Sequence, residues 1–248
     1  STNLTEDSLL TTLTYYHRNK FQIAIHAQGE VAIQGILDAF TKILYKYPRT
    51  NHRHRIEHNA LITKEQIAQA EKLGITLSFF IDHIYYYGDK LEYIVGLERA
   101  ERFMPIQSAI SAGHNATIHT DNPATPIDPF RAISTAVMRK TKDDNVILGK
   151  NEQISVYDAL KSITINAAWQ LFEDQSRGSI TIGKSADLVI LSHNPLEINQ
   201  EEIKNLSVIS TWIDGKQVNH SIYTWKNFKL ILFIIYNYIN TSIKEWFM

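Results

Sequence analysis

Cysteine is absent from this sequence of 248 residues. Its absence excludes disulfide bonds, thiolate metal sites and a cysteine nucleophile. Neither sign of charge is in excess, because 25 Lys and Arg residues face 26 Asp and Glu residues and the formal net charge is −1. A chain without a strong field does not gather nucleic acid or acidic lipid, so we expect neither as a partner.

The first stretch, residues 1–13, also lacks a basic segment followed by a hydrophobic one. It is therefore not a secretory signal, and we expect the protein in the cytoplasm. A chain of this length can bury one substantial core, or form a large domain with a small appendage.

Three stretches alternate apolar and polar residues and then end in a side chain that binds metals. They are F-Q-I-A-I-H at residues 21–26, R-H-R-I-E-H at residues 53–58 and N-A-T-I-H-T-D at residues 115–121. Each predicts a strand, and their last residues are His26, His58 and Asp121, the last because Asn122-Pro123 stops a strand. Two imidazoles and a carboxylate suit zinc or a similar divalent ion, and we expect all three to point inward.

Between these stretches the sequence predicts helices. Apolar residues at helical spacing and capping signals predict helices within 1–20, 33–47, 63–74, 105–113, 131–140 and 155–167. Further strands are expected at 75–80, at 187–191 and in a hairpin at 208–218 whose turn is Asp214-Gly215. Strands that alternate with helices indicate parallel β/α units, whose chemistry collects at the carboxyl ends of the strands.

One motif is rejected. Residues 178–185 match the phosphate-loop spacing G-x-x-x-x-G-K-S. That motif binds phosphate because a helix follows it, whereas the segment 187–191 that follows here reads as a strand. We therefore expect no nucleotide at this turn.

At its metal-binding residues the chain resembles the amidohydrolase superfamily, specifically its amidohydrolase-3, or YtcJ-like, branch. The matching segments are I-A-I-H-A-Q-G-E at 23–30, R-H-R-I-E-H at 53–58, H-T-D-N-P-A-T-P at 119–126 and G-K-S-A-D-L-V-I-L at 183–191. The resemblance implies that His26 and His58 are the metal-binding histidines of the fifth and sixth barrel strands. It implies that Asp121 is the aspartate of the eighth strand.

The fold implied is α/β: the C-terminal half of a (β/α) barrel at residues 1–175, followed by part of a small β-sandwich-like subdomain at residues 176–223. The activity implied is metal-dependent hydrolysis of a carbon–nitrogen bond other than a peptide bond, in a small amide such as an N-substituted amide or formamide. Zinc is the expected metal and Asp121 the expected catalytic proton carrier.

Other polar residues near these strand ends have secondary roles. His119 is a candidate for substrate contact, and so is His83 in the loop expected after residues 75–80, although a histidine beside tyrosines is as readily a packing residue. Glu57 alternates to the strand face opposite His58, so we expect it to give structural support rather than to bind metal.

One departure from the family matters. The His-x-His pair of the first barrel strand and the bridging lysine or acid lie upstream in the family, and this chain begins after them. We expect an N-terminally truncated chain with little or no activity alone. The alternative is a non-catalytic remnant, or a subunit of a split enzyme, because open barrel edges invite pairing with an N-terminal half or a second copy.

The tail at residues 224–248 matches nothing in the family. Its segment 228–239 is rich in Ile, Leu, Phe and Tyr, but it contains Lys229 and Asn237 and is too short for a membrane span. An interfacial helix, an added packing strand and a non-native extension after a disrupted reading frame all remain open, and we favour the extension.

Overall fold

The computed structural model describes residues 4–218, so the predicted tail at 224–248 lies outside the described residues. The first part of the chain alternates strands and helices. In order its elements are α1 Glu6–Arg18, β1 Ala24–Ala27, α2 Glu30–Lys46, β2 Arg55–His58, α3 Lys64–Leu73, β3 Thr76–Phe80, α4 Asp82–Val95, α5 Leu97–Glu101, α6 Ile106–Ser111, β4 Thr117–His119 and α7 Pro129–Met138.

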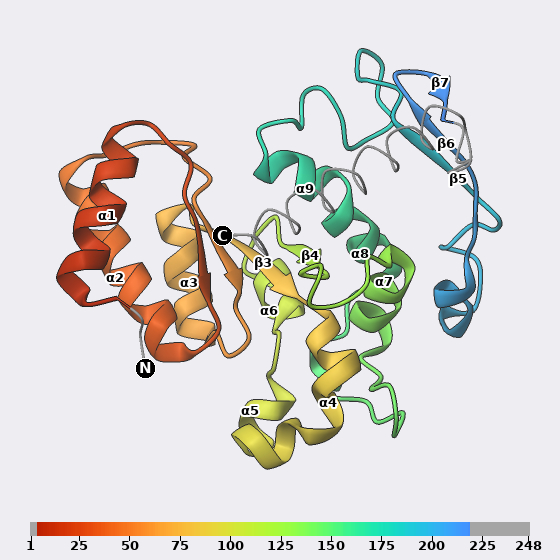
Figure 1. The fold of residues 1–248 in the computed structure, drawn as a ribbon, viewed down its shortest axis with the longest axis horizontal. Coiled ribbons are helices and arrows are strands. Elements are labelled where there is room, and N and C mark those ends of the chain that lie inside the picture. The colour runs from red at the N-terminus through yellow and green to blue at the C-terminus, as the bar shows by residue number, and fades with distance from the viewer. Residues whose placement is uncertain (1–3, 219–248) are drawn as a thin grey trace, which may run out of the picture.

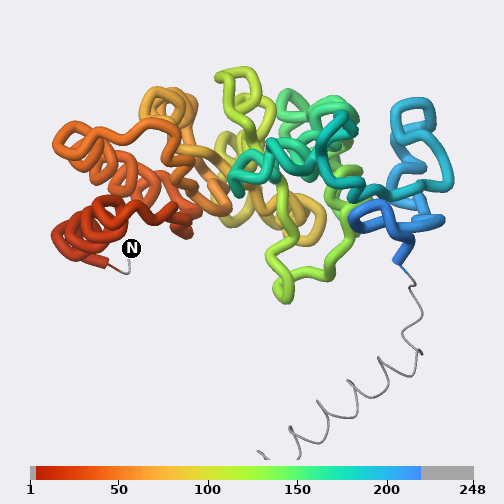
Figure 2. Tube along the Cα trace, turned by 90° about the horizontal axis from the view of Figure 1, so that it is seen from above, coloured from red at the N-terminus to blue at the C-terminus, as the bar shows by residue number. Residues whose placement is uncertain are grey.

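The second part has short helices and then an antiparallel sheet. Its elements are η1 Lys150–Glu152, α8 Val156–Ile163, α9 Ile165–Gln170, β5 Leu188–Leu191, η2 Gln200–Asn205, β6 Val208–Ile213 and β7 Lys216–Gln217. The molecule is elongated, with α1 near one end and the sheet of β5, β6 and β7 at the other (Figures 1 and 2). Within residues 4–218 no helix is both long enough and apolar enough to cross a bilayer.

The first sheet is parallel throughout, in the order β1-β2-β3-β4. Each strand is followed along the chain by one or more helices, as in a (β/α) unit. The fold class is therefore α/β with the architecture of a partial (β/α) barrel, as the sequence predicted.

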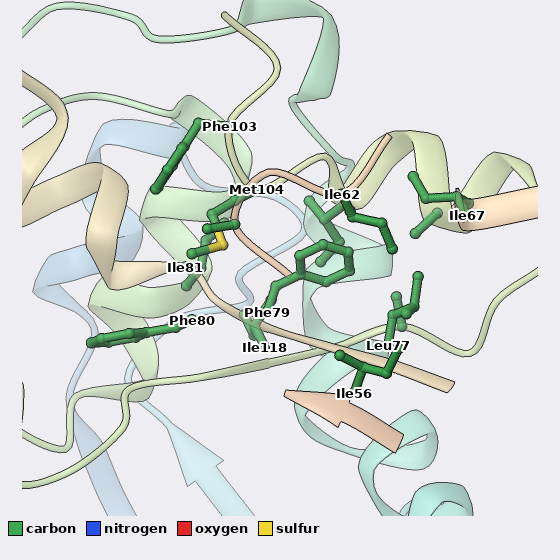
Figure 3. Close-up of a cluster of buried hydrophobic side chains, with 14 of the residues drawn as sticks. Ile56, Ile62, Ile67, Leu77, Phe79, Phe80, Ile81, Phe103, Met104 and Ile118 are labelled. Atoms are coloured by element: carbon green, nitrogen blue, oxygen red, sulfur yellow. The ribbon is translucent and has the colours of Figure 1, made fainter. Parts of the chain in front are cut away.

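The two faces of this sheet differ in chemistry. Residues paired across a parallel ladder share a face. One face is apolar and carries Ile25, Ala27, Ile56, Leu77, Phe79 and Ile118. The other carries Ala24, His26, Arg55, Glu57, Thr76, Ser78, Phe80, Thr117 and His119. In Figure 3, Ile56, Leu77 and Phe79 lie on the same side as Ile67 of α3, and the ring of Phe80 lies apart from them.

Helices α2 and α3 contribute to the core on the apolar face. Six apolar residues of α2 are buried, namely Ile33, Ile36, Leu37, Ala39, Phe40 and Ile43. The N-terminus of α3 has the predicted capping box, in which Thr63 and Gln66 bond each other's backbone N–H groups. Gly74 ends the helix at a φ of 67°, a conformation that costs glycine nothing.

Three predicted boundaries were wrong. The segment after β3 is the helix α4, whereas the sequence analysis expected a loop containing His83. Strand β4 ends at His119, two residues before Asp121. The single helix predicted at 155–167 is two helices, because Thr164 takes φ −120° and ψ −96° between α8 and α9.

The second sheet contains the predicted hairpin of β6 and β7, with β5 paired antiparallel to β6. Strand β5 follows the glycine-rich segment 178–185, as the rejection of a phosphate loop required. Large apolar side chains on this sheet are exposed, including Val189, Ile190 and Ile209. An ion pair between Lys140 and Glu201 joins the end of α7 to η2. The proposed domain boundary between 175 and 176 stays a prediction.

Candidate metal centre

Three imidazoles meet at the carboxyl ends of the parallel strands. The ring centroids of His26 and His58 are 4.4 Å apart, and those of His58 and His119 are 5.0 Å apart. These rings come from β1, β2 and β4, so the fold unites residues that are up to 93 positions apart in the chain. This is the end of a parallel sheet where barrel enzymes place their chemistry.

His58 reaches this cluster by a backbone turn rather than by strand alternation. The register pairs His26 with Glu57 and pairs Ala27 with His58, so alternation alone would place His58 on the apolar face. His58, however, has a φ of 77° at the last position of β2, a left-handed conformation that redirects its side chain. His58 therefore joins the cluster through its backbone conformation and not through strand parity.

His26 also does not end its strand. Strand β1 continues to Ala27, whose carbonyl accepts a hydrogen bond of 3.0 Å from the Asn59 N–H. The hydrogen bonding between β1 and the chain that continues from β2 therefore extends beyond His26. His26 is exposed, and its ring faces that of His58 with the planes at 63°.

His83 and His119 flank the ring of Phe80. The His119 ring stacks on Phe80 at 5.5 Å and 18°, and His83 lies 4.1 Å from Phe80 on the first turn of α4. Burial lowers the pKa of His83 to about 4, and the neighbouring His58 and His119 act in the same direction. Burial likewise lowers the pKa of His119 to about 4, against the opposing field of Glu57. Both imidazoles are neutral at pH 7.

Asp121 follows β4 with a φ of 51° and lies close enough to influence the histidines. Burial lowers the pKa of His58, His26 adds to that effect, and the carboxylates of Asp121 and Glu57 oppose it. The opposing field of Asp121 also acts on His83 and His119. The role of Asp121 as a metal ligand stays a prediction.

Glu57 belongs to the polar face, in register with His26 and Ser78. It forms an ion pair with Arg55 on the same face of β2. From strand alternation Glu57 was expected on the face opposite His58, as structural support rather than as a metal ligand. Because His58 turns at its positive φ, the two side chains act on the same histidine cluster.

The bare nitrogens of the cluster fit a metal ion. Within residues 4–218, the buried atoms His58 Nδ1, His83 Nδ1 and His119 Nε2 have no hydrogen-bond partner. A buried polar atom without a partner costs free energy, and a coordinated ion or a bound substrate would satisfy it. In the same part of the chain, no three His, Asp or Glu side chains stand in an arrangement that would hold one ion. The side chains therefore suit a metal ion in their chemistry and in their unpaired nitrogens, but no three of the described ones are arranged around a single ion position.

A buried acid that the sequence analysis missed ties the Asp121 loop, residues 120–126, to β3. Asp82 is 0% exposed at the start of α4, and its Oδ2 accepts from Arg131 Nη2 at 2.8 Å and from Thr125 Oγ1 at 2.9 Å. Thr125 Oγ1 also lies within hydrogen-bond distance of the Thr120 carbonyl, and Arg131 Nη2 donates to the Pro126 carbonyl at 2.6 Å. The only sequence signal was an acid one residue after a predicted strand.

A second histidine cluster, His17, His52 and His54, lies near the opposite ends of the strands. Its hydrogen bonds fix every tautomer, because carbonyls only accept and backbone N–H groups only donate. His17 Nε2 donates to the Tyr47 carbonyl at 2.8 Å, and His52 Nε2 donates to the Leu73 carbonyl at 2.9 Å.

The remaining nitrogens of this second cluster are also paired. The Ile23 N–H donates to His54 Nδ1 at 3.1 Å, and the His54 N–H donates to His52 Nδ1 at 3.1 Å. His54 Nε2 must then carry a proton and donate to His17 Nδ1, 2.9 Å away. Burial, together with the two neighbouring imidazoles, lowers the pKa of His54 to about 3. All three rings are neutral and fully bonded.

A cavity of about 310 Å³ lies apart from the metal-binding candidates. Its lining comes from α4, α7, the segment after α7 and η2, and includes Tyr85, Tyr86, Arg131 and Lys140. None of His26, His58, His83, His119 and Asp121 lines it. The cavity is therefore not the site of the chemistry expected from the histidines.

Comparison with known proteins gives one family. The sequence profile described as "Amidohydrolase family" matches residues 2–219. The Bacillus subtilis (strain 168) protein YtcJ, which is named as an amidohydrolase, is 29% identical over 221 residues, covering 86% of this chain and 40% of YtcJ. An N-substituted formamide deformylase of Arthrobacter pascens is 28% identical over 194 residues, covering 78% of this chain and 35% of that enzyme.

A solved structure supports the fold. The structure of a metal-dependent hydrolase from Pyrococcus horikoshii OT3, described as uncharacterized, matches with a TM-score of 0.68 and 24% identity. The match covers 80% of this chain and 39% of that protein. The chain thus spans about two fifths or less of each of these three proteins.

Proposed function

Because the chain belongs to the amidohydrolase family, we propose that its residues serve the metal-dependent hydrolysis of a carbon–nitrogen bond other than a peptide bond. The observation that carries the proposal is the meeting of His26, His58 and His119 at the carboxyl ends of the parallel strands, with His58 Nδ1 and His119 Nε2 buried and unbonded within residues 4–218. Most buried polar atoms in proteins are hydrogen-bonded, so nitrogens left unpaired at strand ends support a binding role.

His26, His58 and Asp121 would hold the divalent ion, which we propose to be zinc. When bound, such an ion polarises the substrate carbonyl and lowers the pKa of water toward neutrality. Asp121 accepts a proton from the attacking water and returns it to the leaving nitrogen.

His83 and His119 would contact the substrate. With pKa values of about 4 they are neutral at pH 7, and a neutral imidazole donates one hydrogen bond without adding charge to the site. The ring of Phe80 between them fixes their orientation. They are thus suited to hold a substrate carbonyl in place.

The substrate class in this proposal is a small N-substituted amide or formamide. The relative from Arthrobacter pascens, an N-substituted formamide deformylase, supports it. The nearly balanced charge of the chain offers no field for a polyanion. The cytoplasm as the location is part of the same proposal.

A second candidate function is that of a subunit, or a remnant, that is inactive alone. Two observations favour it. No three side chains within residues 4–218 stand ready to hold an ion, and in the described sheet β1 and β4 are edge strands with one unpaired side each. Another chain, or a second copy, that pairs with an edge would bring further ligands to the strand ends.

One experiment separates these functions. The purified 248-residue chain is titrated with Zn²⁺ by calorimetry and assayed on a panel of N-substituted amides and formamides, with Asp121→Asn as the matched control. Turnover that disappears in Asp121→Asn is the result expected of a hydrolase. Zinc binding without turnover would favour the subunit or remnant, and the absence of both would refute the proposed function.

A further inference from the structure

The Asp121 loop, residues 120–126, is held by hydrogen bonds from three polar side chains, those of Asp82, Thr125 and Arg131. We propose that Asp82, Thr125 and Arg131 form a positioning unit that fixes Asp121 for ion binding, an inference that rests on the proposed function. Asp82 is the anchor, because it sits on the neighbouring element and receives both other side chains.

The anchor is rigid because of where it lies. Asp82 follows β3 after a single residue and is fully buried. The position of its carboxylate is therefore fixed by the sheet and the core around it. A buried carboxylate is tolerated only when it is paired and hydrogen-bonded. Arg131 supplies the charge, at 2.8 Å through Nη2 and 3.4 Å through Nε.

From Asp82 the unit reaches both ends of the Asp121 loop. Thr125, 3% exposed, has one hydroxyl proton, and both of its partners, Asp82 Oδ2 and the Thr120 carbonyl, are acceptors that share it. At the other end Arg131 Nη2 donates to the Pro126 carbonyl at 2.6 Å. Thr120, the residue before Asp121, and Pro126, the last residue of the loop, are thereby both connected to the Asp82 carboxylate through hydrogen bonds.

Between these points the loop has little freedom. The Ala124 N–H donates to the Asp121 carbonyl at 2.7 Å, and Asn122 Nδ2 donates to the Thr125 carbonyl at 3.3 Å. Asp121 itself has a φ of 51°, a left-handed conformation that aspartate can adopt. A ligand on a loop needs such support, because catalytic and metal-binding geometry tolerates errors of only about 0.5 Å.

Arg131 is held in turn from two further directions. Asp128, which caps the N-terminus of α7, accepts from Arg131 Nη1 at 3.3 Å, and the rings of Tyr85 and Tyr86 lie 5.9 and 5.3 Å from its guanidinium. The guanidinium therefore cannot leave Asp82 without losing contacts on α4 and α7. Asp82 and Arg131 thus connect helices α4 and α7 to the loop that carries Asp121.

The test uses Thr125→Val, which keeps the shape of the side chain and removes the shared proton. Thr125→Ser restores the hydroxyl and is the rescue variant. Thr141→Val is the matched control, since Thr141 is also buried and its hydroxyl accepts from the Val146 N–H at 3.0 Å in a different segment. Zn²⁺ affinity by calorimetry, amide hydrogen exchange at Ala124 and melting temperature are measured for each full-length variant.

We expect Thr125→Val to weaken Zn²⁺ binding about 10- to 100-fold, the effect of losing support behind a ligand. Exchange at Ala124 should quicken about 10-fold as the loop loosens. Thr125→Ser should bind within about 2-fold of the wild type, and Thr141→Val should lower only the melting temperature. A purely structural Thr125 would lower the melting temperature and leave Zn²⁺ affinity unchanged, which would overturn the inference.

The remaining outcomes are also decisive. A wild-type chain that binds no Zn²⁺ would overturn the proposed function, and this inference with it. A wild type that binds while Thr125→Val binds equally well would overturn this inference alone. If Thr125→Val does not fold, Asp82→Asn replaces it, because the amide keeps the shape of the anchor and removes its charge. Unchanged Zn²⁺ affinity in Asp82→Asn overturns the inference in the same way.

Discussion

The two histidine clusters lie near opposite ends of the same strands and are built on opposite principles. In the second cluster of His17, His52 and His54 every ring nitrogen has a hydrogen-bond partner. In the candidate metal centre, His58, His83 and His119 each keep a buried nitrogen without a partner among the described residues. The residue type is the same, although His17, His52 and His54 are buried and His83 and His119 are half-buried. The chemical difference between the clusters is whether the lone pairs and protons of the rings are already used.

The comparison shows how to tell a packing histidine from a functional one. His52, His54 and His58 lie within one segment of seven residues, and the sequence alone gives them equal standing. A saturated imidazole stabilises the fold, whereas an unsaturated one costs stability and retains the capacity to bind. Exchange of the same residue type in both clusters should therefore have opposite consequences.

The largest effect is expected for His54→Phe. The substitution keeps a flat ring against Phe40, which stacks on His54 at 5.0 Å, but leaves the Ile23 N–H and His17 Nδ1 without partners. Two buried unsatisfied groups should lower the free energy of unfolding by about 2–4 kcal/mol. Urea denaturation at pH 7.5 measures it. A change below about 0.5 kcal/mol would show that the network contributes little.

The mirror experiment is His58→Phe. Within residues 4–218 no hydrogen bond of the His58 ring is lost, so the free energy of unfolding should change by less than about 1 kcal/mol. Zn²⁺ affinity should fall at least about 100-fold, beyond the usual effect of losing outer support. Calorimetric titration compares it with His54→Phe, which should bind Zn²⁺ normally once folded. An equal loss of Zn²⁺ affinity in both variants would show that the two clusters do not differ in metal binding.

Acid should destabilise the fold in part through the second cluster. Burial lowers the pKa of His52 and of His54, the latter to about 3, so below the ordinary value of 6.5 the unfolded chain binds protons that the folded chain does not. Stability from these neutral rings is complete above pH 6.5 and is lost as the pH falls toward the folded values. His54 alone should account for about 2 kcal/mol between pH 6.5 and 5.

The difference between wild type and His54→Phe isolates this contribution, because His58, His83 and His119 also have lowered pKa values and act with the same sign in both proteins. Urea midpoints at pH 7, 6 and 5 supply the slopes. The variant should show the shallower slope, and identical slopes would show that His54 does not contribute to the acid sensitivity.

The smallest effect is expected for His83→Leu, and its sign is the informative part. His83 buries Nδ1 without a partner among Phe80, Tyr87 and Phe103. Leucine removes the unsatisfied atom and keeps apolar contact, so the metal-free protein should become more stable by about 1 kcal/mol. A thermal melt with chelator checks it. Destabilisation instead would identify His83 as a packing residue.

Much of the fold could be predicted because its signals are local. The apolar face of α2 and the capping box of α3 appear at fixed spacings in the sequence. Helix α4 could not be found in this way, since its buried face consists of Asp82, Ile84, Gly88 and Leu91 and its tyrosines blur the period. The break at Thr164 has no proline or glycine to announce it.

The sequence names the candidate residues of the site, whose roles stay predictions, but it does not reveal their geometry. His26, His58 and Asp121 follow from strand ends and from the family resemblance. That Glu57 shares a cluster with His58 depends on one backbone angle, which alternation does not reveal. The pairing of Asp82 with Arg131 joins positions 49 apart, and no spacing rule covers that distance.

The left-handed φ of His58 is followed by a second left-handed φ, of 54°, at Asn59. Two consecutive residues in this conformation restrict which residue types position 58 can accept during evolution. Glycine, asparagine and aspartate accept that backbone readily, whereas valine and isoleucine do not. A substitution library at position 58 selected for folding alone should enrich the first group. The same library selected for zinc should retain histidine and aspartate, so aspartate is the one ligand exchange that both selections permit.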